Sequence, residues 1–437
     1  MESRIEVFPR ENGQHQRVHW IKWDNWENLS FLRPSPSPKA LTAFRDIYAQ
    51  YLVPACPWIF KSMVIFRLPE DLAVPYPANG LHHRLTAAAV GLKKGMYLQG
   101  GKSHFRDDMT RDFYRELEKR DCVYIVPGKF PGTQIIPVGE YAGDLESAAS
   151  GTAAAVNASF FIMDPFDCAT LHDHVGMPIG LMVKDGVVEN PPLYHREALI
   201  VKKDGSVSVT LPRLEDLTIR IGDREFRNAP IYTRPEYKKA PRSKGKKLTV
   251  VGRQIVAVSE APSVPIPASG FVICAECDAK PGDLVEYLGM EDVAFGIQVG
   301  NSLVRGGIMT TGFISRFYNI YHLEPVPYPP CLYPLDFQKA RAARIVLGAD
   351  KSNRPMLLWA EGKAKLGHDP NADSCGASLA ELAKICQELG MENAVNLDGG
   401  GSAQLLLAGK RHLRICDRNA ADLSDAPRPV PIGLSVK

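Results

Sequence analysis

The stretch AVNLDGGGSAQLLL, residues 394–407, places one carboxylate, three glycines and a hydroxyl between two short apolar segments. Residues 394–397 and 403–407 each predict a strand. Three consecutive glycines are unfavourable for backbone order unless the chain needs positive φ or another group must approach the main chain closely. The pattern therefore indicates a ligand site, and the alternative is a glycine-rich hairpin turn in which Asp398 is merely solvated.

A helix is predicted directly before this stretch, over residues 378–390. Its apolar face carries Leu379, Leu382, Ala383, Cys386 and Leu389. Ser378 can cap its first turn, and Gly390 stands where a C-terminal stop belongs. No Gly-Lys-Ser/Thr follows the three glycines and the chain continues into a strand, which excludes an NTPase phosphate loop and the dinucleotide fingerprint.

Three other segments carry candidate site residues. The segment AAAVNASFF, residues 153–161, predicts a buried strand that ends in Asn157 and two aromatic residues. By its chemistry alone, Asn157 is either a cleft residue or a turn former. The segments ARIVLG (343–348) and MLLWAEG (356–362) predict two further strands, of which the first is led by Arg344 and the second ends in Glu361 and a glycine.

Taken in order, these motifs resemble the phosphodiester glycosidase family. The resemblance rests on the motif NLDGGGS after a helix ending in Leu-Gly, on Asn157 before two phenylalanines, on the strand led by Arg344, and on the terminal strand RPVPIGLSV at 428–436. It spans residues 150–437 nearly continuously. Two departures, Ile345 where the family usually has Thr and Glu361 where it usually has Asp, imply that substrate positioning differs from that of the relatives.

We expect an α+β fold, a mixed α/β structure of largely antiparallel sheets with packed helices. The phosphodiester glycosidase-like catalytic domain should occupy residues 119–437, and residues 1–118 should form an N-terminal helical extension with helices at 41–51 and 107–119. The tryptophans at 20, 23 and 26 are interpreted as a stripe packed on the main body and not as a sugar platform.

The resemblance implies a hydrolase that cleaves the bond between a sugar anomeric carbon and phosphate, in a sugar-1-phosphodiester or a nucleotide-linked sugar. Asp398 would act as nucleophile or general base, Glu361 as a second carboxylate, and Arg344 as the fork that binds phosphate, with Asn157 beside them. The proposed substrate-binding residues are Asn396, Gly399, Gly400, Gly401, Ser402, Arg428 and Phe161. The implied partner is a small phosphosugar or glycan substrate.

Two alternatives stay open at this point. The first is a protein that binds a phosphosugar or polysaccharide without cleaving it. The second is a metal-dependent phosphodiesterase that holds a divalent cation, Mg²⁺ or Ca²⁺, at His172, Asp173 and His174. The sequence itself requires no cofactor, since this loop completes none of the strict zinc spacings.

Composition limits the remaining classes of function. The net charge of +3 arises from 52 basic and 49 acidic residues, so nucleic acid is not indicated as a partner. Residues 1–30 carry scattered charges and no apolar run, and no later apolar stretch is long enough to span a bilayer. Nine dispersed cysteines favour free thiols over a disulfide framework. We therefore expect a cytoplasmic protein that does not associate with membranes.

Overall fold

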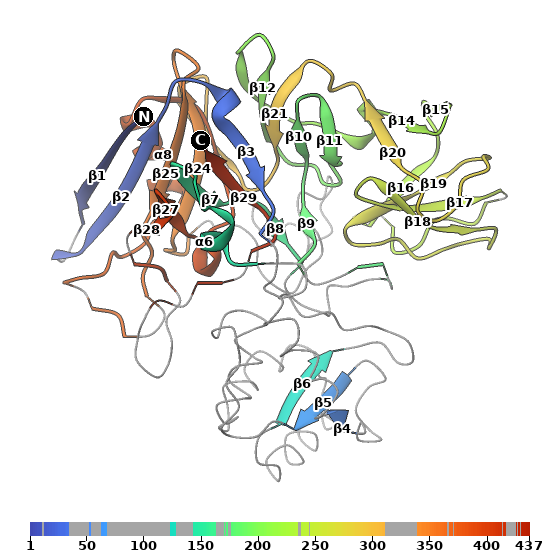
Figure 1. Ribbon diagram of the computed structural model, residues 1–437, viewed down its shortest axis with the longest axis horizontal. Helices are drawn as coiled ribbons and strands as arrows, with labels where there is room; N and C mark the ends of the chain where they lie inside the picture. The colour runs from blue at the N-terminus through green and yellow to red at the C-terminus, as the bar shows by residue number, and fades with distance from the viewer. Residues whose placement is uncertain are drawn as a thin grey trace.

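The computed structural model describes six parts of the chain, of which residues 143–310 and 339–437 are the longest (Figure 1). The described residues are 1–34, 52–53, 63–67, 123–127, 143–310 and 339–437, without 11–12, 163–169, 171, 174–175, 235–236, 244, 365–366, 370, 413, 417–424, 426 and 429. The helices expected at 41–51 and 107–119 lie outside these residues, as does the boundary expected between residues 118 and 119. Those expectations stay predictions.

The largest sheet has seven strands, and each pairs antiparallel with its neighbours. In spatial order it runs β1 (Glu2–Pro9), β2 (His15–Lys22), β25 (Pro355–Ala360), β24 (Arg344–Asp350), β26 (Met391–Asn396), β22 (Ser302–Arg305) and β23 (Ile308–Met309). All seven residues of β24 are buried, because Ile345 and Leu347 face the main core while Val346 faces a second core under a helix. The central strand is therefore covered on both faces.

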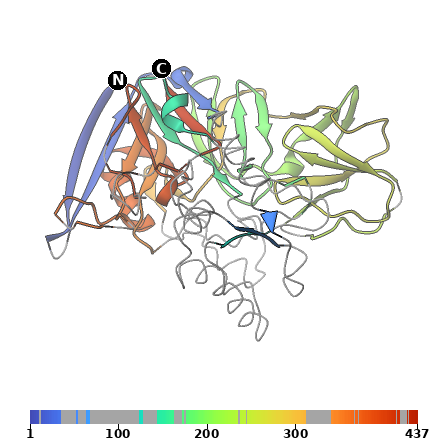
Figure 2. The same ribbon diagram turned by 60° about the horizontal axis from the view of Figure 1, so that its bottom comes forward.

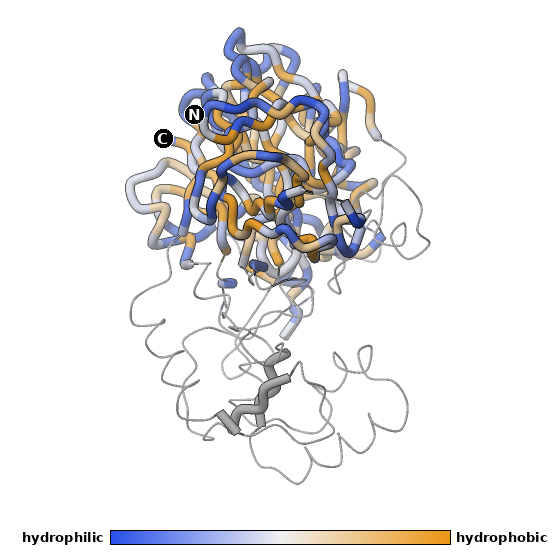
Figure 3. The backbone as a smooth tube through the Cα atoms, turned by 90° about the vertical axis from the view of Figure 1, so that its right-hand side faces the viewer, coloured by the Kyte–Doolittle hydropathy of each residue, from blue (hydrophilic) through white to orange (hydrophobic). Residues whose placement is uncertain are grey.

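A five-stranded sheet lies beside it and joins the two ends of the chain (Figure 2). Its order is β28 (Lys410–Arg411), β27 (Leu405–Leu407), β7 (Ala154–Asn157), β29 (Gly433–Val436) and β3 (Leu29–Leu32). Val436 pairs with Leu29, so the last strand of the chain lies next to one of the first. The apolar side chains of both sheets meet in one core, and the hydrophobic segments gather inside the described body (Figure 3).

The remaining described strands form five further sheets, in which neighbouring strands pair antiparallel. One sheet has β11 (Val187–Asn190), β10 (Met182–Lys184), β21 (Val293–Ile297), β12 (Ala198–Lys202) and β13 (Val207–Thr210). Two others have β15 (Arg224–Phe226), β14 (Thr218–Ile221) and β20 (Val285–Leu288), and β16 (Ile231–Thr233), β19 (Gly270–Cys274), β17 (Lys247–Val251) and β18 (Gln254–Ser259). The last two have β8 (Phe160–Phe161) with β9 (Pro178–Ile179), and β4 (Leu52–Val53), β5 (Met63–Arg67) and β6 (Val123–Pro127).

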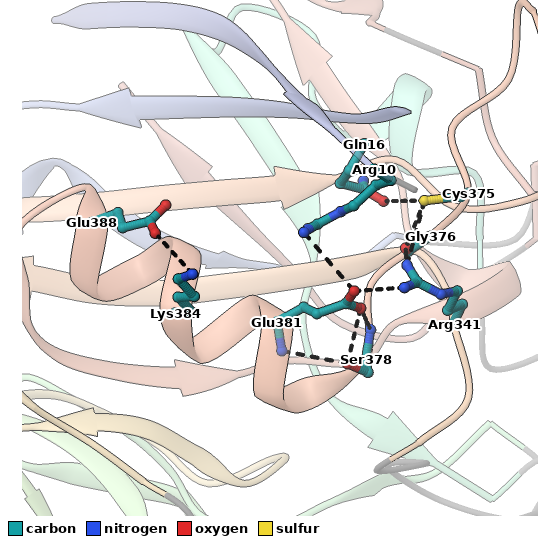
Figure 4. Close-up of polar contacts among 9 residues, drawn as sticks. All are labelled: Arg10, Gln16, Arg341, Cys375, Gly376, Ser378, Glu381, Lys384 and Glu388. Carbon is teal, nitrogen blue, oxygen red and sulfur yellow. Dashed lines mark hydrogen bonds and ion pairs between the residues drawn. The ribbon is translucent and has the colours of Figure 1, made fainter. Parts of the chain in front are cut away.

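The helix predicted before the glycines is present as α8 (Leu379–Glu388) and packs on β22, β23 and β26. Ser378 and Glu381 form a reciprocal capping box, which satisfies two otherwise orphaned backbone donors. Arg341 and Arg10 approach the Glu381 carboxylate at 2.6 and 3.9 Å (Figure 4). Burial opposes ionisation of Glu381, but the hydrogen bonds from Ser378 and the two positive charges outweigh it and lower its pKa.

The expected α+β class with packed helices is wrong. The described residues are mostly β, and their α-helices are α8 and the four-residue α6 (Leu145–Ala148). The antiparallel pairing is as expected, but the one long helical pattern, at 379–390, is an isolated element and not one of a layer of helices. No helix in the described part of the chain is long and apolar enough to cross a membrane.

The N-terminal helical extension is also wrong for the residues that are described before 35. Residues 2–32 form β1, β2 and β3 and the short 3₁₀ turn Trp26–Asn28, and these strands belong to the two main sheets. Strand β2 is buried on both faces, with Trp20 toward the helix side and Ile21 toward the main core. The tryptophans do pack on the main body, but on a strand and a turn instead of a helix.

The cysteines in the described residues are consistent with the free-thiol prediction. Cys274, Cys277, Cys375 and Cys386 are free thiols. Burial raises the pKa of the Cys386 thiol far above its usual range, which makes this thiol unreactive.

We predict that His19 makes the stability of this fold depend on pH. His19 is 2% exposed and its ring lies edge-on to His412, with 5.3 Å between the centroids. Burial, and then the charge of His412, lowers the pKa of His19 from 6.5 to about 4. Between these two pKa values the unfolded chain binds a proton at His19 and the folded protein does not. The free energy of unfolding should therefore fall as pH is lowered from about 6.5 toward about 4, by at most about 3 kcal/mol.

Urea unfolding at several pH values in this window, on wild type and His19→Gln, measures the effect. The variant should show a flatter dependence of the free energy of unfolding on pH. Parallel curves for the two proteins would show that other groups cause the loss of stability.

Candidate functional site

The Asp398 loop, residues 397–404, crosses from the seven-stranded sheet to the five-stranded sheet. The amide of Leu397 donates to the carbonyl of Ile345 in β24 at 2.8 Å. The next amide, that of Asp398, donates at 2.9 Å to the carbonyl of Ala158, directly after β7. Asp398, 9% exposed, therefore lies at the junction of the two sheets.

Two of the three glycines are required by the path of this loop. A Cβ at Gly399 would lie 2.6 Å from the carbonyl oxygen of Ala343, so only glycine fits there. Gly400 has φ +62 and donates its amide to the same carbonyl at 2.8 Å. The Gly400 N–H group is thus used inside the protein, so substrate binding through a glycine amide stays a prediction for Gly399 and Gly401.

Asn157 holds both ends of the loop. Its Nδ2 donates to the carbonyl of Asp398 at 2.8 Å, and its Oδ1 accepts from the amide of Gln404 at 2.9 Å. The side chain is 1% exposed at the end of β7. Asn157 is therefore a strand residue whose amide group fixes the loop, and its turn-former alternative is not what the structure shows.

The two arginines among the expected site residues, Arg344 and Arg428, both donate hydrogen bonds to other parts of the protein. Arg344, 3% exposed, donates through Nε to the carbonyl of Ala377 at 3.1 Å and through Nη2 to that of Ala340 at 3.0 Å. Arg428, 5% exposed, donates through Nη1 to the hydroxyl of Ser402 at 3.1 Å. Part of each guanidinium thus serves the protein's own structure.

Glu361, the expected second carboxylate, is directed into a buried polar network. Its Oε2 accepts from Arg17 Nε at 2.9 Å and from Ser374 Oγ at 2.7 Å. Its Oε1 accepts from the amide of Arg414 at 2.9 Å. The residue is 1% exposed, so its carboxylate ties the N-terminal strand β2 to two later loops.

The two remaining expected binding residues are buried close to the loop. Asn396, 1% exposed, donates its amide to the carbonyl of Asn301 at 2.9 Å, and its carbonyl accepts from Gly300 at 2.8 Å. Phe161, 3% exposed, pairs with Pro178 in the two-stranded β8–β9 ribbon. Phe161 is therefore packed inside and does not offer an open stacking surface.

The structure describes only part of the expected cation site. His174 lies outside the described residues. The carboxylate of Asp173 accepts from the amide and hydroxyl of Thr170 and from those of Ser269, at 2.8 to 3.1 Å. His172 lines a cavity of about 380 Å³ with Met177 and Pro178. Within the described ranges, no three His, Cys, Asp or Glu residues gather as cation ligands would.

Sequence reasoning missed three buried polar residues: Gln404 at the end of the Asp398 loop, Ser159 directly after Ala158, and Arg196, which contacts Phe160. Ser159 Oγ and Gln404 Oε1 are both buried, and neither has a hydrogen-bond partner in the described part of the chain. The guanidinium of Arg196, 5% exposed, lies 5.1 Å from the ring centroid of Phe160. Ser159 and Gln404 stand inside the quoted motifs and could have been found there, whereas nothing in the sequence around Arg196 distinguishes it.

Comparison with known proteins supports the resemblance in the C-terminal part of the chain. A family model described as phosphodiester glycosidase matches residues 269–437. This range contains β24, β25, α8, β26 and the whole Asp398 loop. The predicted resemblance is thus confirmed for these residues, while residues 150–268 lie outside the match. A search of curated proteins found no significant match.

Several solved structures are similar to this chain at low identity. A hypothetical protein from Synechocystis has 17% identity and a TM-score of 0.41, and the alignment covers 99% of this chain and 61% of that one. The zebrafish N-acetylglucosamine-1-phosphodiester α-N-acetylglucosaminidase catalytic domain, auto-inhibited by its pro-peptide, has 13% identity and a TM-score of 0.40. That alignment covers 100% of this chain and 82% of the zebrafish chain. A putative exported protein from Burkholderia pseudomallei has 14% identity and a TM-score of 0.38, and the alignment covers 100% of this chain and 96% of that one.

We predict that Asn157→Ala destabilises the protein by roughly 2–4 kcal/mol, because it leaves the Asp398 carbonyl and the Gln404 amide without their buried partner. The matched control is Asn371→Ala, which truncates an exposed asparagine and should change stability by less than about 0.5 kcal/mol. Denaturant unfolding measures both. Equal stability of the two variants would mean that the Asn157 side chain does not hold the loop.

Proposed function

We propose that this protein, whose residues 269–437 match the phosphodiester glycosidase family, is a hydrolase that cleaves the bond between a sugar anomeric carbon and a phosphate oxygen. The substrate would be a sugar-1-phosphodiester or a nucleotide-linked sugar. The observation that carries the proposal is the position of Asp398. This carboxylate lies within the matched residues, at the junction of two sheets, on a loop held by hydrogen bonds at both ends.

The chemistry of such a cleavage makes modest demands on acid catalysis. The leaving group is a phosphate monoester, already a stable anion, so protonating it matters less than in ordinary glycoside hydrolysis. The oxocarbenium-like centre needs a negative charge or an activated water beside it. Asp398 is suited to this role, as nucleophile or as general base.

The rigidity of the loop supports a catalytic role for Asp398. Its amide is bound by Ala158 and its carbonyl by Asn157, so the backbone on both sides of the carboxylate is fixed before any substrate arrives. A group held in its reactive position avoids the entropy loss that positioning would otherwise require in the transition state.

Glu361 fits a positioning role better than that of an acid in contact with substrate. Both of its oxygens accept hydrogen bonds from Arg17, Ser374 and the Arg414 backbone. A Cβ added at the adjacent Gly362 would lie 2.3 Å from the amide nitrogen of Ala343. Gly399 of the loop packs against the carbonyl of the same alanine. The Glu361 network therefore supports the segment at Ala343, whose carbonyl accepts a hydrogen bond from the amide of Gly400 in the Asp398 loop.

We predict that Asp398→Asn lowers the rate of hydrolysis by roughly 10²- to 10⁴-fold, because the amide keeps the shape of the side chain but removes its charge and basicity. The measurement is turnover of a panel of sugar-1-phosphodiesters and nucleotide-linked sugars. Asp223→Asn, in an exposed hairpin turn, is the matched control and should retain full activity. Thermal melts of both variants should coincide with that of wild type.

Reaction in ¹⁸O-labelled water distinguishes this proposal from its alternatives. Label in the sugar product supports cleavage at the anomeric carbon, whereas label in the phosphate would identify a phosphodiesterase. Binding of phosphosugars without turnover by wild type would identify a binding protein. Full activity of Asp398→Asn would show that Asp398 is not the catalytic carboxylate.

A further inference from the structure

Strand β1 is an open edge of the seven-stranded sheet in the described part of the chain. It pairs with β2 on one side, and no described strand pairs with its other side. In both views β1 lies at the outside of the described body (Figures 1 and 2). An open edge presents main-chain donors and acceptors that a strand of another molecule can bind.

The main-chain groups on this open edge belong to the odd-numbered residues of β1. In β2 the odd-numbered residues bond to β25, as the carbonyl of Arg17 does when it accepts from the amide of Glu361 at 3.0 Å. The even-numbered residues of β2 therefore bond to β1, where they lie opposite even-numbered residues. The amides and carbonyls that point outward are those of Ser3, Ile5 and Val7.

The side chains of these residues form an exposed, largely apolar row. Ile5 is 48% exposed and Val7 is 59% exposed. Ser3 lies opposite Ile21, a residue of the main core, so the row extends the core face of the sheet beyond β2. The pairing of β1 with β2 has no bulge, and an unbulged edge strand with exposed apolar residues is a favourable template for a further strand.

The opposite face of β1 carries two charges that are complementary to each other. Arg4 and Glu6 are two residues apart and therefore point to the same face. Arg4 is 3.0 Å from Glu2 in an ion pair whose side chains are 67% and 51% exposed, and such a surface pair stabilises little, so it is readily exchanged for another. Glu6 accepts from Trp20 Nε1 at 2.8 Å, which orients its carboxylate without neutralising the charge.

We propose that β1 pairs antiparallel with β1 of a second copy of this chain, about a two-fold axis at Ile5. In this register Ile5 lies opposite Ile5 of the second copy, and Ser3 lies opposite Val7 of the second copy. Arg4 then lies opposite Glu6 of the second copy, and the symmetry repeats this pair. The outward groups form about six main-chain hydrogen bonds, and the two seven-stranded sheets become one.

The other two-fold registers fit this strand less well. An axis at either charged residue of the pair places that charge opposite itself, which is destabilising. An axis at Val7 places Ile5 opposite Pro9, which has no amide donor. An axis at Ser3 leaves Val7 outside the paired segment. The axis at Ile5 is the register that uses the apolar row and both charges together.

Sedimentation equilibrium of the whole chain over a range of concentrations tests the dimer. Wild type should dimerise with a Kd in the micromolar range, because one pair of strands is a small interface. Arg4→Glu places like charges opposite each other and should weaken the dimer roughly 10-fold, and adding Glu6→Arg to this variant should recover most of the loss. The matched control is Arg227→Glu, at a side chain that is 74% exposed, which should dimerise as wild type does.

Cysteine cross-linking tests the register. Ile5→Cys places two thiols directly opposite each other with their Cα atoms about 5.5 Å apart, so mild oxidation should link two chains. Ser3→Cys is the matched control, because its two copies would lie roughly 14 Å apart and should stay unlinked. Linkage of Ser3→Cys without linkage of Ile5→Cys would overturn the axis at Ile5.

Hydrogen exchange at Ser3, Ile5 and Val7 shows what covers the edge. Protection of these amides that rises with the fraction of dimer supports the pairing. A chain that stays monomeric at every concentration overturns it, as does a dimer that Arg4→Glu leaves unchanged. Protection in the monomer would show that another segment of the same chain covers β1. None of these measurements involves turnover, so failure of the proposed function leaves the dimer untouched, and the reverse holds too.

Discussion

The amide side chain of Asn157 is the interaction on which this site depends. One buried group binds the carbonyl of Asp398 and the amide of Gln404, so the loop between the two main sheets is held at its beginning and at its end. Both bonds are inaccessible to water, where a lost partner costs about 1–3 kcal/mol. A loop of three glycines has large conformational freedom, and this clamp removes much of it at the position where a carboxylate must be held still.

The N-terminal strands β1 and β2 contribute to the same rigidity within the seven-stranded sheet, on the side of β24 that lies away from β26. Strand β2 pairs with β25. Arg17, near the start of β2, forms an ion pair with the carboxylate of Glu361, which directly follows β25. This ion pair is buried on the Glu361 side, so breaking it would leave an uncompensated charge in the interior. The first residues of the chain therefore belong to the framework that supports Asp398, although they are more than 300 positions away from it.

The sequence predicted the local elements well wherever a short pattern dictates them. Helix α8 was predictable from its apolar spacing, its Ser378 cap and its Gly390 stop, and the glycines marked a loop in which another backbone approaches closely. The fold class failed because helices were expected in a region where strands β1 to β3 join sheets formed by residues far along the chain. That pairing depends on contacts between residues distant in sequence, and a local pattern carries no information about them.

The candidate site shows the same division between local and distant information. Asp398, Asn157 and Ser402 stand in motifs, and the structure brings them together. The motifs could not show that both polar atoms of the Asn157 side chain form hydrogen bonds to the loop, or that Glu361 accepts from Arg17. No motif marks Arg196, whose guanidinium lies over Phe160 and whose carbonyl accepts from Gln298 Nε2. In the described part of the chain, Ser159 Oγ and Gln404 Oε1 are buried without a hydrogen-bond partner, which costs stability that proteins give up mainly at functional sites.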